Sequence, residues 1–142
     1  MKKFVLLLTA LSMFSTNVPA KTIDTSDIKT DISDVSDLTP RYTAITGMNN
    51  DISISSGKAN CYGKTTVSSG YKAKVKVELQ QKGTSWKTLK TWTVSGKLSA
   101  TVDEPYTLTK GNSYRLKTTH YALNTNGNVA EYVTQYSKTV TY

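Results

Sequence analysis

Two side chains in this sequence could serve nucleophilic catalysis, Cys61 and the single histidine, His120. A catalytic thiol or hydroxyl needs a base within hydrogen-bond reach, so any such site would depend on His120. His120 stands in the stretch KTTHYAL, where alternation puts it on the same side of a strand as Leu116 and opposite Arg115. We therefore expect a histidine of the core or of an interface, and we expect Cys61 to be a small buried hydrophobic residue.

The sequence also lacks the residues that a metal site, a phosphate-binding loop or a glycosidase would need. One histidine and one cysteine are too few for a zinc site. The aspartates of residues 24–37 are interleaved with apolar residues and lack the glycine turn of a calcium loop. No glycine-rich loop opens a helix after a strand, and the five carboxylates of residues 41–142 offer little for a glycosidase pair. The sequence therefore predicts no enzyme, no cofactor and no metal site.

The clearest functional signal is a row of cations on alternate residues. In the stretch Ala73–Leu79 the apolar side chains point one way and the charged ones the other, and successive lysines lie about 6.7 Å apart. The stretch Tyr114–Leu123 presents further charged side chains in the same manner. If these two strands pair, one exposed face carries five cations and a tyrosine, with Glu78 at one end. The candidate binding residues are Lys72, Lys74, Lys76, Arg115, Lys117 and Tyr121.

The elements that must position these residues are strands. From Tyr42 onward the hydrophobic period is two, and turn signals recur every 8–12 residues with no helical segment. Lys82–Ser85 and Lys110–Asn112 look like turns, and Asn126-Gly127 is typical of a two-residue hairpin loop before one long last strand, 129–142. This pattern predicts an all-β domain of seven or eight strands, a single antiparallel β-sandwich. A small β-barrel is the alternative.

The segment Gly111–Leu116 resembles the tyrosine corner of immunoglobulin-like sandwiches. In that motif a tyrosine opens the penultimate strand two residues before an inward core position, which Leu116 would fill here. Cys61 would be the buried residue on the opposing strand. The sequence departs from true immunoglobulin domains because it has no second cysteine and no tryptophan on the central strand.

A second resemblance covers about residues 41–142. It is carried by Gly57–Cys61, by Leu79–Gly83 with Trp86–Trp92, and by Tyr114–Lys117 after a glycine turn. Together these segments resemble a family of small secreted proteins of Gram-positive bacteria that is classed as a domain of unknown function. The resemblance implies secretion and a β fold, and it implies no activity.

The first forty residues have the pattern of an exported protein. Lys2 and Lys3 precede a mostly apolar run of eleven residues, and Val18-Pro19-Ala20 offers small residues to a signal peptidase. That run is too short to cross a hydrocarbon core of about 30 Å at about 1.5 Å per residue. We therefore expect a signal peptide at 1–20, a flexible acidic leader at 21–40, and the β-sandwich domain at 41–142. An amphipathic docking helix is the alternative for residues 21–40, because Ile28, Ile32, Val35 and Leu38 recur near helical spacing.

Charge is divided unevenly between the leader and the domain. Residues 21–40 carry two Lys against five Asp, a net charge of −3, whereas residues 41–142 carry fourteen Lys and Arg against five carboxylates, a net charge of +9. A basic secreted domain indicates contact with anionic polymers or surfaces. Lysine also keeps exposed β faces soluble and protects sheet edges, so charge alone leaves that explanation open.

Two functions fit these observations. The first is a secreted, non-catalytic binding module that contacts an anionic envelope, matrix or host-surface polymer through the basic sheet face. The second is a secreted membrane-active or cell-active factor of the bacteriocin or toxin type. A specific protein partner with incidental charge is a third possibility, and nucleic acid is not expected in the extracellular compartment.

The mature secreted protein is expected to begin at Lys21, because Val18 and Ala20 occupy the positions that signal peptidase recognises. Mass spectrometry of the culture medium measures this directly. Recovery of an intact Met1 in a membrane fraction would contradict it.

Overall fold

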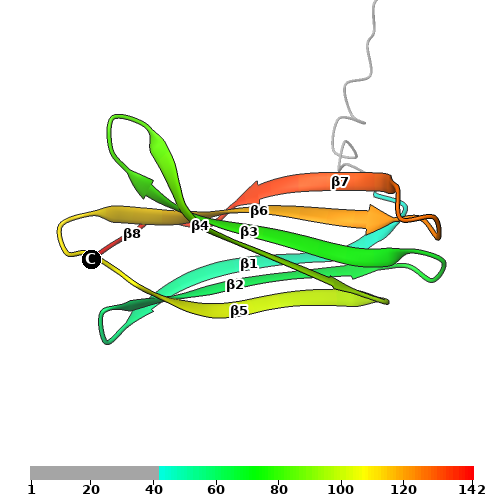
Figure 1. Ribbon diagram of the computed structural model, residues 1–142, viewed down its shortest axis with the longest axis horizontal. Coiled ribbons are helices and arrows are strands. Elements are labelled where there is room, and N and C mark those ends of the chain that lie inside the picture. The colour runs from blue at the N-terminus through cyan, green and yellow to red at the C-terminus, as the bar shows by residue number, and fades with distance from the viewer. Residues whose placement is uncertain (1–41) are drawn as a thin grey trace, which may run out of the picture. The chain divides into compact units, whose positions relative to one another are not determined.

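The computed structural model describes residues 42–142, which form eight strands in two antiparallel sheets (Figure 1). The signal peptide and the leader expected at 1–40 lie outside the described residues. Within residues 42–142 no helix is long and apolar enough to span a membrane. The strands are β1 (Ile45–Ser55), β2 (Lys58–Val67), β3 (Lys72–Lys82), β4 (Trp86–Gly96), β5 (Ser99–Thr107), β6 (Ser113–Leu123), β7 (Val129–Tyr136) and β8 (Val140–Thr141).

The strands divide into two layers, which confirms the predicted β-sandwich. One sheet has the order β1-β2-β5, and the other has the order β4-β3-β6-β7, with β8 also paired to β6. Figure 1 shows the two layers face to face, with the β3–β4 hairpin extending away from the body of the sandwich. Among the described strands no ladder joins the two sheets, so the domain is an open sandwich and not a barrel.

The core follows the period of two that the sequence displays. In β2 the side chains at alternate positions from Ala59 to Val67 are buried, and in β3 those from Ala73 to Leu79 are buried. Gly63 allows β2 and β3 to approach closely, because a Cβ at this position would lie 2.5 Å from Cγ2 of Val77. Cys61 is free and fully buried in this core, as predicted. Burial raises the pKa of the Cys61 thiol to about 12, so it stays protonated.

The tyrosine corner is confirmed in atomic detail. Tyr114 is buried at the start of β6, and its hydroxyl donates to the carbonyl of Thr109 at 2.8 Å. The same hydroxyl accepts from the backbone N–H of Thr109 at 3.0 Å. Leu116 is fully buried two residues later. The tyrosine therefore fixes the loop between β5 and β6 to the strand that follows it.

Glu131 on β7 binds the backbone of the residues that lead into β1. Its two carboxylate oxygens accept from the backbone N–H groups of Thr43, Ala44 and Ile45 at 3.1, 3.1 and 2.6 Å. Hydrogen bonds to a charged acceptor are stronger than those between neutral groups. This carboxylate thus ties the residues that lead into β1 to an edge strand of the opposite sheet.

The structure differs from the sequence-based expectation at two turns. Asn126-Gly127 is not a two-residue hairpin loop, because β6 and β7 are joined by residues 124–128 and only Gly127 has a positive φ, of 83°. The side chain of Asn124 accepts from the N–H groups of Asn126 and Asn128 and so builds the longer loop. The tight turn with two positive φ values is instead Ser56-Gly57, between β1 and β2.

The last strand is also shorter than expected. It is interrupted after Tyr136, because Ser137 turns its hydroxyl to accept from the N–H of Leu116 at 2.8 Å. Ser137 also donates its own N–H to the carbonyl of Leu116. The side chain thereby takes the place of a backbone partner, and the chain resumes pairing with β6 only at Val140.

Replacing Tyr114 by Phe is expected to lower the free energy of unfolding by about 1.5–3 kcal/mol. The change removes a hydroxyl with two backbone hydrogen bonds and leaves both groups of Thr109 without their partner. Chemical denaturation measures the loss. Tyr132→Phe is the matched control, since Tyr132 is 66% exposed, and equal losses in both variants would contradict the assignment.

Candidate binding face

The pairing of β3 with β6 brings the six sequence-predicted residues onto one outward face. The register sets Lys74 opposite Tyr121, Glu78 opposite Lys117, and Gln80 opposite Arg115. The intervening residues, such as Leu79 and its partner Leu116, are buried. Since successive side chains alternate between the two faces, one register fixes both the core and the charged surface.

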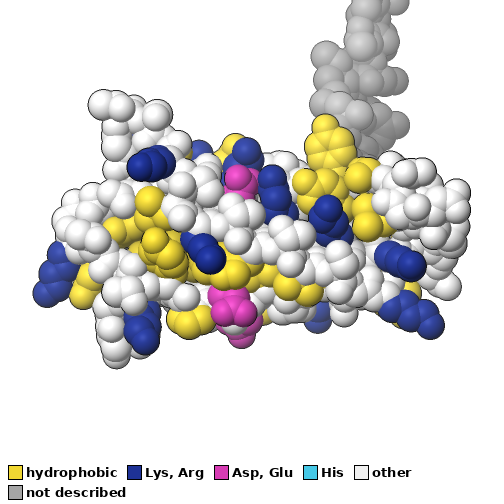
Figure 2. All heavy atoms as spheres, viewed as in Figure 1, with side chains coloured by type: hydrophobic (Ala, Val, Ile, Leu, Met, Phe, Trp, Pro, Cys, Tyr) yellow, Lys and Arg dark blue, Asp and Glu magenta, His cyan; other side chains and the backbone are white. Residues whose placement is uncertain are grey.

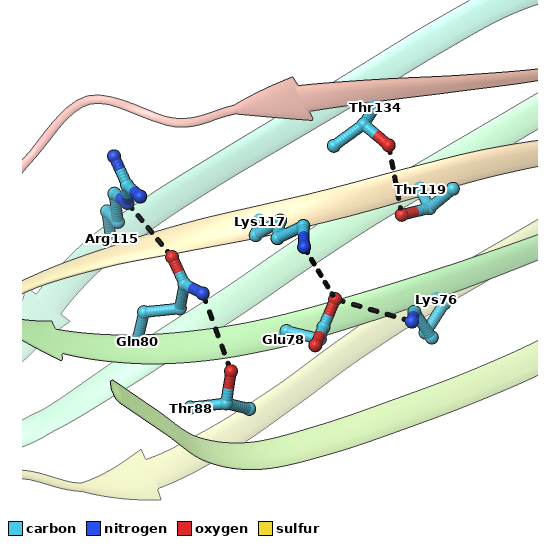
Figure 3. Close-up of polar contacts among 8 residues, drawn as sticks. All are labelled: Lys76, Glu78, Gln80, Thr88, Arg115, Lys117, Thr119 and Thr134. Carbon is cyan, nitrogen blue, oxygen red and sulfur yellow. Dashed lines mark hydrogen bonds and ion pairs between the residues drawn. The ribbon is translucent and has the colours of Figure 1, made fainter. Parts of the chain in front are cut away.

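The only carboxylate on the outward side of β3 and β6 lies in the middle of this face, not at one end as expected. Glu78 forms ion pairs with Lys76 at 3.4 Å and with Lys117 at 4.0 Å, and its side chain is 15% exposed (Figure 3). Two lysines are therefore partly neutralised by one carboxylate. The cations on either side of this triad keep their charge for solvent or for a ligand.

Arg115 is held on three sides by its neighbours. Its guanidinium carbon lies 4.1 Å from the centre of the Trp86 ring and 4.2 Å from the centre of the Tyr136 ring. Its Nε donates to Oε1 of Gln80 at 3.0 Å, and the Gln80 amide in turn donates to Thr88 at 3.4 Å (Figure 3). Residues from β3, β4, β6 and β7 thus converge on one guanidinium.

A second group of aromatic rings and a cation lies towards the other end of β3. The ammonium of Lys74 is 5.2 Å from the centre of the Tyr121 ring, and Tyr121 and Tyr132 have ring centres 6.3 Å apart. Tyr132 is among the most exposed aromatic residues of the described chain. Aromatic rings of this kind offer an apolar surface with a polar edge next to positive charge.

Four cationic or aromatic residues of this face are absent from the sequence-based set: Lys82, Trp86, Tyr132 and Tyr136. Alternation within each strand could have put Tyr132 and Tyr136 on a common side of β7. Alternation cannot identify the neighbouring strand, and Trp86, Tyr132 and Tyr136 belong to the face because β4 and β7 flank the β3–β6 pair. We use "basic face" below for the outward side chains of the β4-β3-β6-β7 sheet.

Positive charge is not confined to the basic face. Figure 2 shows Lys and Arg side chains spread over the side of the molecule seen in that view, with few Asp and Glu among them. Lys58 and Lys64, for example, are exposed on β2 in the other sheet. Variants at these lysines can therefore serve as controls that distinguish an effect of total charge from an effect of the basic face.

Lys72 is the first residue of β3 and lies at one end of the basic face. It borders a cavity of about 360 Å³ at the end of the sandwich where the β2–β3, β4–β5 and β6–β7 connections meet. Lys97 and the apolar side chains of Tyr71 and Leu98 also line it. The cavity depends on three connections far apart in sequence, so no sequence pattern could have indicated it.

His120 is a core residue, as predicted. It is fully buried on β6, and its Nδ1 is 2.8 Å from Oγ1 of Thr65 on β2, so one hydrogen bond links the two sheets. Burial lowers the pKa of His120 from 6.5 to about 4. Gln135 partly opposes this shift, although no hydrogen bond of good geometry reaches Nε2.

No protein-family model matches this chain, and no curated protein matches it. These comparisons therefore neither support nor oppose the resemblance to small secreted proteins of Gram-positive bacteria.

The burial of His120 predicts a loss of stability in mild acid. The unfolded chain takes up a proton on this residue below about pH 6.5, whereas the folded chain does so only near pH 4. Stability from the neutral ring is complete above pH 6.5 and falls by at most about 3 kcal/mol as the pH drops through this window. Denaturant titrations across the window measure it, with His120→Asn as control. Equal pH dependence of both proteins would contradict the assignment.

Proposed function

We propose that this domain is a secreted, non-catalytic binding module that contacts an anionic polymer with its basic face. The single observation that carries the proposal is the imbalance of charge on β3 and β6. Their outward side chains include Lys72, Lys74, Lys76, Lys82, Arg115 and Lys117 against Glu78 alone. The extracellular location depends on the signal peptide that the sequence predicts.

The spacing of the cations suits an extended ligand better than a compact one. Lys74 and Lys82 are eight residues apart on one strand, a span of about 27 Å at about 3.4 Å per residue. The cations therefore form a long row beside the exposed rings of Tyr132 and Tyr136. A polymer with repeated negative groups can contact several of these positions at once.

Each exposed lysine contributes little to the free energy of binding, but several lysines in a row contribute together. A lysine near an anionic surface is worth about 1 kcal/mol, and its contribution is reduced by salt. Several lysines on one rigid sheet give a useful affinity because their relative positions are fixed before binding. Because the sheet is ordered before binding, no conformational entropy is lost in ordering a protein segment.

Replacing Lys72 and Lys74 together by Gln is expected to weaken binding to inorganic polyphosphate by about tenfold. Neither lysine is paired with Glu78, so the melting temperature should stay close to that of the unchanged domain. Fluorescence anisotropy at low and high salt measures the affinity and its salt dependence. Binding should weaken steeply as salt is added.

The matched control is the pair Lys58→Gln and Lys64→Gln, which removes the same charge from the opposite sheet. Equal weakening in both double variants would mean that total charge matters and the basic face does not. Failure of the unchanged domain to bind any polyanion would remove the proposal and leave the lysines to solubility and edge protection. Leakage of anionic vesicles would instead favour a membrane-active factor.

A further inference from the structure

The guanidinium of Arg115 is restrained in a way that the lysines of the basic face are not. The rings of Trp86 and Tyr136 are in van der Waals contact with it, since their centres lie 4.1 and 4.2 Å from the guanidinium carbon. Gln80, which is only 7% exposed, accepts from Nε at 3.0 Å. Gln80 is itself held by Thr88, so the support extends to a further residue.

This environment leaves one part of the guanidinium available. The rings of Trp86 and Tyr136 pack against the guanidinium, and its Nε–H donates to Gln80. Among residues 42–142 no hydrogen bond or ion pair reaches its terminal amino groups. Glu78, the nearest carboxylate along β3, is engaged by Lys76 and Lys117 instead. The two terminal amino groups therefore present a pair of parallel donors with no acceptor of their own.

A paired donor of this kind matches one chemical class of ligand. Phosphate and carboxylate groups carry two oxygens whose spacing fits the two amino groups of a guanidinium. Lysine cannot reproduce this geometry, because its ammonium acts as a point charge. Lys82, whose ammonium lies 5.3 Å from the centre of the same Trp86 ring, adds a second positive charge nearby.

We infer that Arg115 is a preformed anchor for one oxyanion group, bound through both terminal amino groups of its guanidinium. The inference rests on the proposed function for its polymeric ligand, and it adds which residue determines specificity within the basic face. Arginine normally loses much side-chain freedom on binding. Here Trp86, Tyr136 and Gln80 have already restricted the side chain, so that cost falls on folding.

The first test exchanges the geometry of the donor and keeps its charge. Arg115→Lys is expected to weaken binding to inorganic polyphosphate at least fivefold, although the net charge is unchanged. Lys64→Arg is the matched control, an exchange of the same two residue types at an exposed position of the opposite sheet, and it should bind like the unchanged domain. Equal binding by Arg115→Lys and the unchanged domain would overturn the inference.

The second test does not need a polymer. The indole N–H resonances of Trp86 and Trp92 are followed by NMR while inorganic phosphate or acetate is added, with Trp92→Phe used for assignment. A saturable shift at Trp86 that is absent in Arg115→Lys supports the anchor, and the anion with the larger response identifies its chemistry as phosphate or carboxylate. No shift with either anion, or a shift that persists in Arg115→Lys, would overturn it.

The two tests separate this inference from the proposed function. A Trp86 response to phosphate without binding of any polyanion supports the anchor and removes the polymer-binding proposal. Polymer binding that depends on Lys72 and Lys74, without an effect of Arg115→Lys, supports the basic face and removes the anchor.

Discussion

The register between β3 and β6 is the constraint on which the rest of this structure depends. Leu79 faces Leu116 on the inside, and on the next residue Gln80 faces Arg115 on the outside. A slip of one residue would move every buried side chain of one strand to the surface and every cation to the core. Because burial of an unpaired cation costs far more free energy than a surface contact can return, the apolar core holds the basic face in place.

Around the β3–β6 pair, specific polar interactions fix the loops, the start of β1 and the contact between the sheets. The hydrophobic effect is non-directional and does not determine the geometry of these places. Tyr114 fixes the connection between β5 and β6, and Glu131 fixes the residues that lead into β1 to β7. His120 and Thr65 join the sheets inside the core. With no disulfide available to the single cysteine, these contacts and the packed strands must supply the stability of the described domain.

The basic face illustrates how a stable scaffold can carry a solvent-exposed set of cations. Its lysines cost little on the outward side of a sheet, and Glu78 balances two of them. Arg115 differs, because four strands contribute to its surroundings. In the proposed function, the lysines provide general attraction and the restrained Arg115 provides geometry.

The sequence by itself determined which side chains of a strand share a face. The period of two placed Lys72, Lys74 and Lys76 outward, Cys61 and His120 inward, and Tyr114 at a tyrosine corner, since alternation is a local property of extended chain. Only the tertiary structure decided which strands are neighbours, because pairing is set by contacts between residues far apart in the chain. The meeting of Arg115 with Trp86 and Tyr136, the central position of Glu78, and the break at Ser137 all depend on that pairing. The loop at 124–128 likewise departs from the Asn-Gly signal, because the side chain of Asn124 caps a longer turn.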